Sequence, residues 1–319
     1  MSASGDEKPV VLVTAADLAP DAVALLDGYE LVYAGKTPSE EDIAALCKRH
    51  DPVAIIVRYG KVGTMAMDAA PALRVISKHG SGTDTIDKVA AKARNIEVRA
   101  ATGANAAAVA EQALALLLAC AKSVPQLDAR MHAGFWDKAM HKSLELGGRT
   151  VGLIGLGAIG QRFGRMAKGM DMRVIGFDPY ARNVPDFIET VDLAALWKSA
   201  DVISLHCPLT DENRNLLNAE TLKQCKRGVL VVNTARGGLI DEAALLAAVR
   251  AGQVACAGLD SFAVEPMVHG HPFQQQPGFI LSPHIGGVTS DAYVNMGVAA
   301  ARNVLEVVRT APAHCAAST

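Results

Sequence analysis

Short apolar runs alternate with helical patterns along most of this chain. The first hundred residues contain five runs that we predict as strands: Val10–Thr14, Leu31–Ala34, Ala54–Arg58, Arg74–Lys78 and Glu97–Arg99. A second set of six follows: Val151–Ile154, Arg173–Phe177, Val202–Leu205, Val229–Asn233, Ala255–Leu259 and Ile280–Leu281. Strands that alternate with helices are typical of parallel sheets that helices cover. We therefore predict an α/β fold with two doubly wound parallel sheets.

The helical patterns between these runs have recognisable ends. Ser39 precedes the pattern over Glu40–Arg49 and is a suitable N-cap residue. Gly252 follows the pattern over Glu242–Arg250, which is typical of a helix C-terminus. The long apolar pattern over Ala106–Lys122 lies between the two sets of strands, so we predict a helix that bridges two domains.

A glycine-rich turn follows the first strand of the second set. The order there is strand, Gly155-Leu156-Gly157-Ala158-Ile159-Gly160, helix, strand and Asp178. Glycines permit the tight turn, the approach of a pyrophosphate and close helix packing, and the helix start attracts phosphate. Asp178 stands close to the roughly 20-residue spacing of an acid that binds ribose hydroxyls. A carboxylate repels a 2′-phosphate, so NAD is favoured over NADP, although the nearby Arg182 weakens that preference.

Two sets of strands predict two domains in a chain of 319 residues. The last helical pattern, Ala292–Thr310, has no strand after it, so we expect the chain to return to the first domain. The predicted domains are residues 1–101 with 288–319 for substrate binding and 102–287 for dinucleotide binding. We expect the active site in the crevice between them, where closure excludes water.

Composition excludes several partners. The formal net charge is −2, which gives no general electrostatic footprint for nucleic acid or a membrane surface. Glu111 and Gln112 interrupt the apolar stretch Ala106–Ala121, which is shorter than the roughly 18 residues of a membrane span. The first ten residues lack the pattern of a secretory signal. The six cysteines are scattered without CxxC spacing, so we expect no disulfide framework, no metal site and a cytoplasmic location.

Four polar residues stand at strand ends of the second set or in the loops after them. Arg236, Asp260, Glu265 and His284 follow the last three predicted strands. Ligands of open parallel sheets bind outside the carboxyl ends of strands, so these residues are candidates for hydride-transfer chemistry. Plain alternatives stay open: a surface ion pair for the arginine, an ordinary loop histidine, and a turn at Glu265-Pro266.

Seven motifs in order give the chain a family likeness over nearly its whole length: VRYGKVG, SKHGSGTDTID, TGANAAAVAEQ, VGLIGLGAIGQ, VNTARGG, LDSFAVEP and SPHIGG. The chain resembles the D-isomer-specific 2-hydroxyacid dehydrogenase family, in particular its phosphoglycerate dehydrogenase-like branch. The resemblance implies a flavodoxin-like lid domain that binds substrate, and a Rossmann domain that binds NAD. It further implies an NAD-dependent oxidoreductase, a small 2-oxo or 2-hydroxy acid as substrate, and a homodimer.

The resemblance also implies a role for each matching residue. His284 would be the acid/base, Glu265 would orient the imidazole and favour its cation, and Arg236 would bind the substrate carboxylate. Asp260 would accept a hydrogen bond from the nicotinamide carboxamide. Ser81 and Gly82 would hold the carboxylate through backbone N–H groups.

Other positions concern the far end of the substrate. Tyr59 stands where the phosphoglycerate dehydrogenase-like branch often has a small hydroxyl residue, and Thr102 where proline is frequent. Arg58, Tyr59, Lys61 and His79 suggest a second acidic group on the substrate, unless Arg58 and Lys61 are merely solvated.

Two other functions remain open at the level of sequence. An NAD-sensing, corepressor-like scaffold on the same fold would not require Arg236, Glu265 and His284 together. A formate dehydrogenase would have a substrate too small to need the basic residues around Arg58.

Overall fold

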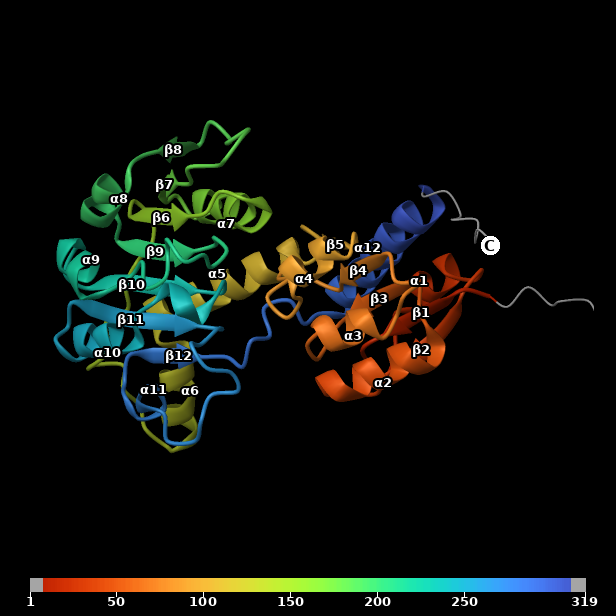
Figure 1. Ribbon diagram of the computed structural model, residues 1–319. Coiled ribbons are helices and arrows are strands. Elements are labelled where there is room, and N and C mark those ends of the chain that lie inside the picture. The colour runs from red at the N-terminus through yellow and green to blue at the C-terminus, as the bar shows by residue number, and fades with distance from the viewer. Residues whose placement is uncertain (1–7, 311–319) are drawn as a thin grey trace, which may run out of the picture. The chain divides into compact units, whose positions relative to one another are not determined.

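The computed structural model describes residues 8–310 and contains two parallel sheets (Figure 1). The chain divides into two units, one made of the chain up to Asn105 with the segment from Thr289 onward, the other of Ala106–Val288. The predicted α/β class with two parallel sheets is confirmed.

The sheet of the first unit has the strand order β2-β1-β3-β4-β5, which is the flavodoxin-like order. Its strands are β1 (Val10–Val13), β2 (Glu30–Tyr33), β3 (Ala54–Val57), β4 (Val75–Lys78) and β5 (Glu97–Ala100). Its helices are α1 (Pro20–Leu25), α2 (Glu40–His50), α3 (Thr64–Asp68), α4 (Lys88–Ala93) and α12 (Ser290–Thr310). Alternate side chains of the strands pack against α1 and α12 on one face and against α2, α3 and α4 on the other.

The last helix, α12, is tied to the first unit by polar contacts to its backbone. The Arg74 guanidinium donates to the Val307 and Val308 carbonyls at 2.9 and 3.1 Å, near the helix end where carbonyls lack intrahelical partners. Ser77 Oγ donates to the Ala300 carbonyl at 3.1 Å. These bonds explain why a helix that follows the second unit in sequence packs on the sheet of the first.

The sheet of the second unit has the order β12-β11-β10-β9-β6-β7-β8, which is the Rossmann order extended by one strand. Its strands are β6 (Thr150–Ile154), β7 (Arg173–Phe177), β8 (Ile188–Thr190), β9 (Val202–Leu205), β10 (Val229–Asn233), β11 (Val254–Leu259) and β12 (Phe279–Leu281). Its helical segments are α5 (Ala106–Lys122), α6 (Val124–His132), α7 (Ala158–Gly169), α8 (Leu193–Ser199), α9 (Ala219–Gln224), η1 (Gly237–Leu239), α10 (Glu242–Arg250) and α11 (Pro272–Gln275).

The central strands of this second sheet are buried on both faces. Every residue of β6, β9 and β10 is buried, as in parallel sheets that helices cover on both sides. α5 and α7 share one apolar cluster with the sheet, and α8, α9 and α10 share the other. The carboxyl ends of all seven parallel strands therefore meet at one edge, and the loops after them carry the candidate site.

The predicted strands are all present, with ends that differ by at most two residues, and the Ser39 cap of α2 forms a capping box with Asp42. The sequence prediction lacked β8, a three-residue edge strand in which only Ile188 is buried. No single helix within residues 8–310 has the length and apolar character to cross a membrane. α5 and α6 meet that criterion only as a pair, and a bend of 63° separates them.

Candidate active site

The glycine turn of the second unit joins β6 to α7. Gly155 has a φ of 98°, and a Cβ there would lie 2.6 Å from the Cys207 backbone nitrogen. A Cβ on Gly160 would lie 2.1 Å from the Gly155 carbonyl oxygen. A Cβ on Gly157, by contrast, would meet no atom within 4 Å. The first two glycines thus permit close packing, while the space outside Gly157 is open to a ligand.

The start of α7 offers hydrogen-bond donors to that space. Gly157 is the N-cap residue and has no side chain to accept from the first turn, which contains Ala158 and Ile159. Unpaired N–H groups and the positive end of the helix dipole make such a start suitable for phosphate. The residues present therefore fit the pyrophosphate of a dinucleotide.

Asp178 follows β7 and is fixed beside the glycine turn. Its Oδ2 accepts from the Leu156 N–H at 2.8 Å, and its Oδ1 accepts from the Tyr180 N–H at 2.9 Å. A carboxylate oxygen can accept a second hydrogen bond, so both oxygens retain capacity for ribose hydroxyls. The structure therefore brings Asp178 and the glycine turn together, as the order of the sequence motif predicts.

His284 and Glu265 form a hydrogen-bonded pair at this edge. They lie in the loops after β12 and β11, which are neighbouring parallel strands. His284 Nδ1 lies 2.6 Å from Glu265 Oε2, while Glu265 Oε1 accepts from the Phe262 N–H at 2.9 Å. The two side chains are 46% and 35% exposed, so the imidazole is held by the carboxylate and still accessible to a ligand.

Asp260, at the end of β11, is buried and organises the loop that carries His284. Its Oδ1 accepts from Ser282 Oγ at 2.6 Å and from the Ile285 N–H at 2.9 Å. Its Oδ2 accepts from the Gly286 N–H at 2.7 Å. A carboxylate has about four acceptor positions, so one remains on Oδ2 for an external amide.

Arg236 follows β10, the next strand of the sheet, and is half-buried. Its Nη1 donates to the Ala235 carbonyl at 2.7 Å. The adjacent Gly237 packs closely against the loop that leads to Glu265: a Cβ on Gly237 would lie 1.9 Å from the Phe262 carbonyl carbon. Glycine at this position lets the loops of Arg236 and Glu265 pack directly on one another.

The first unit holds a separate group of the predicted residues. Ser81 and Gly82 lie in the loop after β4, where Ser81 is exposed and its Oγ donates to Asn105 Oδ1 at 3.1 Å. Arg58 and Tyr59 follow β3, at the same edge of that sheet. These four residues therefore share the carboxyl edge of the first sheet, while His284 and Glu265 lie at that of the second.

Arg58 is held by partners that the sequence analysis did not identify. Its Nη1 donates to the Asp17 carbonyl oxygen at 2.9 Å and to the Asp17 carboxylate. Its guanidinium lies 5.4 and 4.8 Å from the ring centroids of Tyr59 and Tyr293. Asp17 and Tyr293 are 276 residues apart, and no local motif links them.

Two further residues support the loop of His284 and were also missed. Gln112, on α5, donates through Nε2 to Ser282 Oγ at 3.0 Å, and Ser282 donates in turn to Asp260. Gln112 ends the motif TGANAAAVAEQ and Ser282 begins the motif SPHIGG. Their place in these motifs was the signal by which the sequence could have identified them. Their link across 170 residues was not visible in the sequence.

Three neighbouring strands, β10, β11 and β12, thus carry a guanidinium, a buried carboxylate and an imidazole backed by a second carboxylate. These groups can bind an acid, orient an amide and transfer a proton. The dinucleotide turn lies at the same edge of the same sheet. Together they define the class of dinucleotide-dependent oxidoreductases.

Comparison with known proteins agrees with this class. The family described as "D-isomer specific 2-hydroxyacid dehydrogenase, NAD binding domain" matches residues 114–286. The chain is 37% identical to the hydroxypyruvate reductase of Thermotoga maritima over 276 residues, which are 86% of this chain and 90% of that protein. It is 38% identical to the D-3-phosphoglycerate dehydrogenase of Archaeoglobus fulgidus over 263 residues, 81% of this chain and 50% of that protein.

A solved structure gives the same result. The glyoxylate reductase from Paecilomyes thermophila superimposes with a TM-score of 0.85 and 27% sequence identity, covering 95% of this chain and 96% of that chain. The chain belongs to the D-isomer-specific 2-hydroxyacid dehydrogenase family, a family of NAD-dependent oxidoreductases. The predicted family and NAD cofactor are confirmed. The chain spans about half the length of the phosphoglycerate dehydrogenases that it matches.

Proposed function

We propose that the protein interconverts a small 2-oxo acid and its D-2-hydroxy acid by hydride transfer with NAD. The observation that carries the proposal is the 2.6 Å contact between His284 and Glu265, on the sheet that bears the dinucleotide turn. Proton transfer to a carbonyl oxygen requires an accessible imidazole with a partner that favours its cation, whereas a scaffold requires neither. Arg236, in the adjacent loop, supplies the cation that an acid substrate needs.

The second unit would hold NAD through three features. The first turn of α7 after Gly157 would bind the pyrophosphate, Asp178 the ribose hydroxyls and Asp260 the carboxamide. When bound, the nicotinamide exchanges a hydride with carbon 2 of the substrate.

The protein's own groups perform the remaining steps. In reduction, His284 donates a proton to the carbonyl oxygen, and Glu265 stabilises the imidazolium before that transfer. Arg236 holds the carboxylate with its planar fork and polarises the keto group. In oxidation, the neutral imidazole removes the hydroxyl proton.

We assign substrate binding to the first unit. Backbone N–H groups at Ser81 and Gly82 bind the carboxylate, because they lie in a glycine-rich loop at the carboxyl edge of that sheet. Arg58 and Tyr59, in the loop after the neighbouring strand β3, border the far end of the substrate. The corresponding domain limits are residues 1–101 with 288–319, and 102–287.

The experiment that tests this function combines a substrate panel with two variants. Glyoxylate, hydroxypyruvate, phosphohydroxypyruvate and oxaloacetate are each supplied with NADH. His284→Ala should lower kcat/KM by roughly 10²–10⁴-fold, the contribution of a positioned proton donor. Arg236→Ala should also remove most of the turnover, because the substrate carboxylate loses its guanidinium partner. NADH binding, followed by fluorescence titration, should survive in both variants. His269→Ala, an exposed histidine of the same unit, is the matched control.

Three results would refute the proposal. Unchanged rates in both variants would remove the assigned roles. No turnover of any 2-oxo acid beside tight NADH binding would favour the NAD-sensing scaffold, and oxidation of formate alone would favour a formate dehydrogenase.

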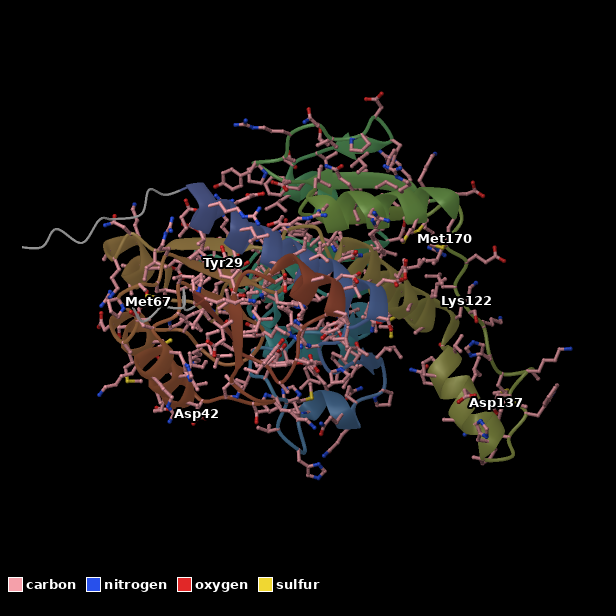
Figure 2. The ribbon with its side chains drawn as sticks, turned by 90° about the vertical axis from the view of Figure 1, so that its right-hand side faces the viewer. Tyr29, Asp42, Met67, Lys122, Asp137 and Met170 are labelled. Carbon is pink, nitrogen blue, oxygen red and sulfur yellow. The ribbon has the colours of Figure 1, made fainter. Side chains whose placement is uncertain are left out.

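We further propose a homodimer, formed through the segment that includes α6. Figure 2 shows α6 and Asp137 standing away from the rest of the second unit. Large apolar side chains are exposed there, including Trp136 at 76% and Met140 at 89%. Such a surface is typical of an interface. Light scattering of the purified protein measures the mass directly. A cytoplasmic location remains a prediction.

A further inference from the structure

The loops at the carboxyl edge of the first sheet contain an ionic cluster, of which the proposed function uses only Arg58 and Tyr59. Asp17 follows β1, Arg58 and Tyr59 follow β3, His79 follows β4, and Tyr293 comes from the first turns of α12. Ligand sites of open parallel sheets lie at this edge, so these side chains border the substrate end of the first unit.

The Arg58 charge is already balanced within the protein. Its side chain is only 15% exposed, and its guanidinium donates to both the carbonyl and the carboxylate of Asp17. The Tyr293 hydroxyl donates to the same carboxylate at 2.9 Å. The two donors lower the pKa of Asp17, Tyr293 first and Arg58 second, so the carboxylate stays ionised at neutral pH. The cluster therefore contains one cation and one anion.

The backbone of this loop is fixed as well. The Arg58 N–H donates to Thr14 Oγ1 at 3.0 Å, and Thr14 Oγ1 donates to the Tyr59 carbonyl at 2.6 Å. Lys78 Nζ donates to the Arg58 carbonyl at 3.0 Å. Tyrosine rings next to the guanidinium add cation–π attraction. Arg58 therefore has little freedom to leave Asp17 for a substrate anion.

His79 adds no positive charge at this edge. It is 8% exposed, and burial, with the nearby Arg58 charge as the second cause, lowers its pKa to about 4. The imidazole is consequently neutral near pH 7. Lys61 is an exposed residue of the same edge and a flexible, hydrated cation.

We propose that the Asp17–Arg58–Tyr293 cluster makes this site select 2-oxo acids whose far end is uncharged, such as a hydroxymethyl group or hydrogen, over acids with a second anionic group. The proposal rests on the proposed function and names its substrate class. It replaces the sequence-based expectation of a second acidic group. Asp17 repels a second anion and occupies the guanidinium that would otherwise attract one, while Tyr59, which is 51% exposed, offers an apolar ring to an uncharged side chain.

The test compares hydroxypyruvate with phosphohydroxypyruvate, which differ in whether the far end is a hydroxyl or a phosphate. The purified protein with NADH should show a kcat/KM at least about tenfold higher for hydroxypyruvate. Asp17→Asn keeps an acceptor for Arg58 but removes the negative charge. We expect it to shift the ratio of the two kcat/KM values toward phosphohydroxypyruvate by about tenfold or more, chiefly through a lower KM for that substrate.

Two further variants control this result. Tyr293→Phe removes only the hydroxyl donor and keeps the Asp17 charge and its pairing with Arg58, so the preference for hydroxypyruvate should persist. Asp21→Asn removes a charge from the exposed first turn of α1 and should leave the ratio unchanged. Thermal unfolding verifies that each variant is folded.

The outcomes separate the substrate class from the proposed function. If the unmutated protein prefers phosphohydroxypyruvate and binds its phosphate through Lys61 or Arg58, the substrate class is wrong. The proposed function would still hold. An unchanged ratio in Asp17→Asn would likewise overturn the substrate class. Failure to reduce any 2-oxo acid would refute the proposed function itself.

Discussion

Replacing Glu265 with glutamine tests how the proton donor is prepared. In the protein, one carboxylate oxygen accepts from the Phe262 N–H and the other faces His284 Nδ1. A glutamine has one accepting oxygen and one donating NH₂ group. Because the Phe262 N–H can only donate, it fixes the amide oxygen on its own side. The NH₂ group then faces His284 Nδ1, which must stay unprotonated, and the imidazolium is disfavoured.

The size of the effect follows from the two hydrogen bonds. Forming the cation requires the glutamine amide to turn, which leaves the Phe262 N–H without its acceptor at a cost of about 1–3 kcal/mol. The bond between an imidazolium and a carboxylate, about 1.5–3 kcal/mol, is also lost. Both side chains are partly exposed, so water replaces part of each lost hydrogen bond, and the lower end of each energy range applies. A total of about 2.5 kcal/mol corresponds to a loss of roughly 10²-fold.

The assay is the initial rate of NADH oxidation with hydroxypyruvate near neutral pH. Glu265→Gln should lower kcat/KM for reduction by roughly 10²-fold and leave NADH affinity unchanged. Glu242→Gln is the matched control: Glu242 Oε1 accepts from the Ala263 N–H at 2.9 Å, in the same loop and without contact to His284. A loss below about threefold in Glu265→Gln, or an equal loss in both variants, would refute the reasoning.

Two other predictions concern the cofactor and acid stability. Asp178→Asn removes the charge and keeps one of the two backbone contacts, because the amide oxygen accepts from the Leu156 or the Tyr180 N–H but the NH₂ group cannot accept. The kcat/KM ratio of NADH to NADPH should fall by about tenfold or more, and an unchanged ratio would contradict the role of Asp178. His79 has a pKa of about 4 in the folded protein, below its ordinary 6.5, so the unfolded chain takes up its proton first as pH falls. The folded protein therefore loses stability as the pH falls from 6.5 to about 4, by about 2 kcal/mol at pH 5. His79→Gln should reduce the fall in the unfolding midpoint between about pH 7 and 5.

Most of the fold is predictable because parallel strands in a covered sheet are buried on both faces. Their sequences, such as Ala54–Val57 and Val229–Asn233, are continuous apolar runs that need no knowledge of their neighbours. The edge strand Ile188–Thr190 was missed because it has one buried residue and two exposed ones, and so lacks a continuous apolar run. This strand carries too little apolar pattern to be recognised, whereas the other edge strands, β2, β5 and β12, were predicted.

The candidate site divides in a similar way. Gly155, Gly160 and Asp178 belong to one local motif, so their spacing in the sequence was enough to predict that they lie together. The roles of Glu265 and His284 came from the family resemblance, and the contact between them depends on the pairing of β11 with β12. The contact between Asp17 and Tyr293 could not be predicted, because the expected return of the last helix to the first domain does not say which of its residues meets the loop after β1. Sequence reasoning left open whether Arg58 faces substrate or solvent, and it did not include Asp17.

Asp260 holds the loop that carries His284, the proton donor that we propose. Its three hydrogen bonds go to Ser282, Ile285 and Gly286, on both sides of His284. His284 itself has a φ of 54°, a left-handed conformation that a non-glycine residue keeps only where the surroundings impose it. The buried Asp260 carboxylate therefore holds the backbone on both sides of His284, and we propose that it also binds the cofactor amide. A change at Asp260 should alter cofactor affinity and turnover together, whereas a change at Glu265 should alter turnover alone.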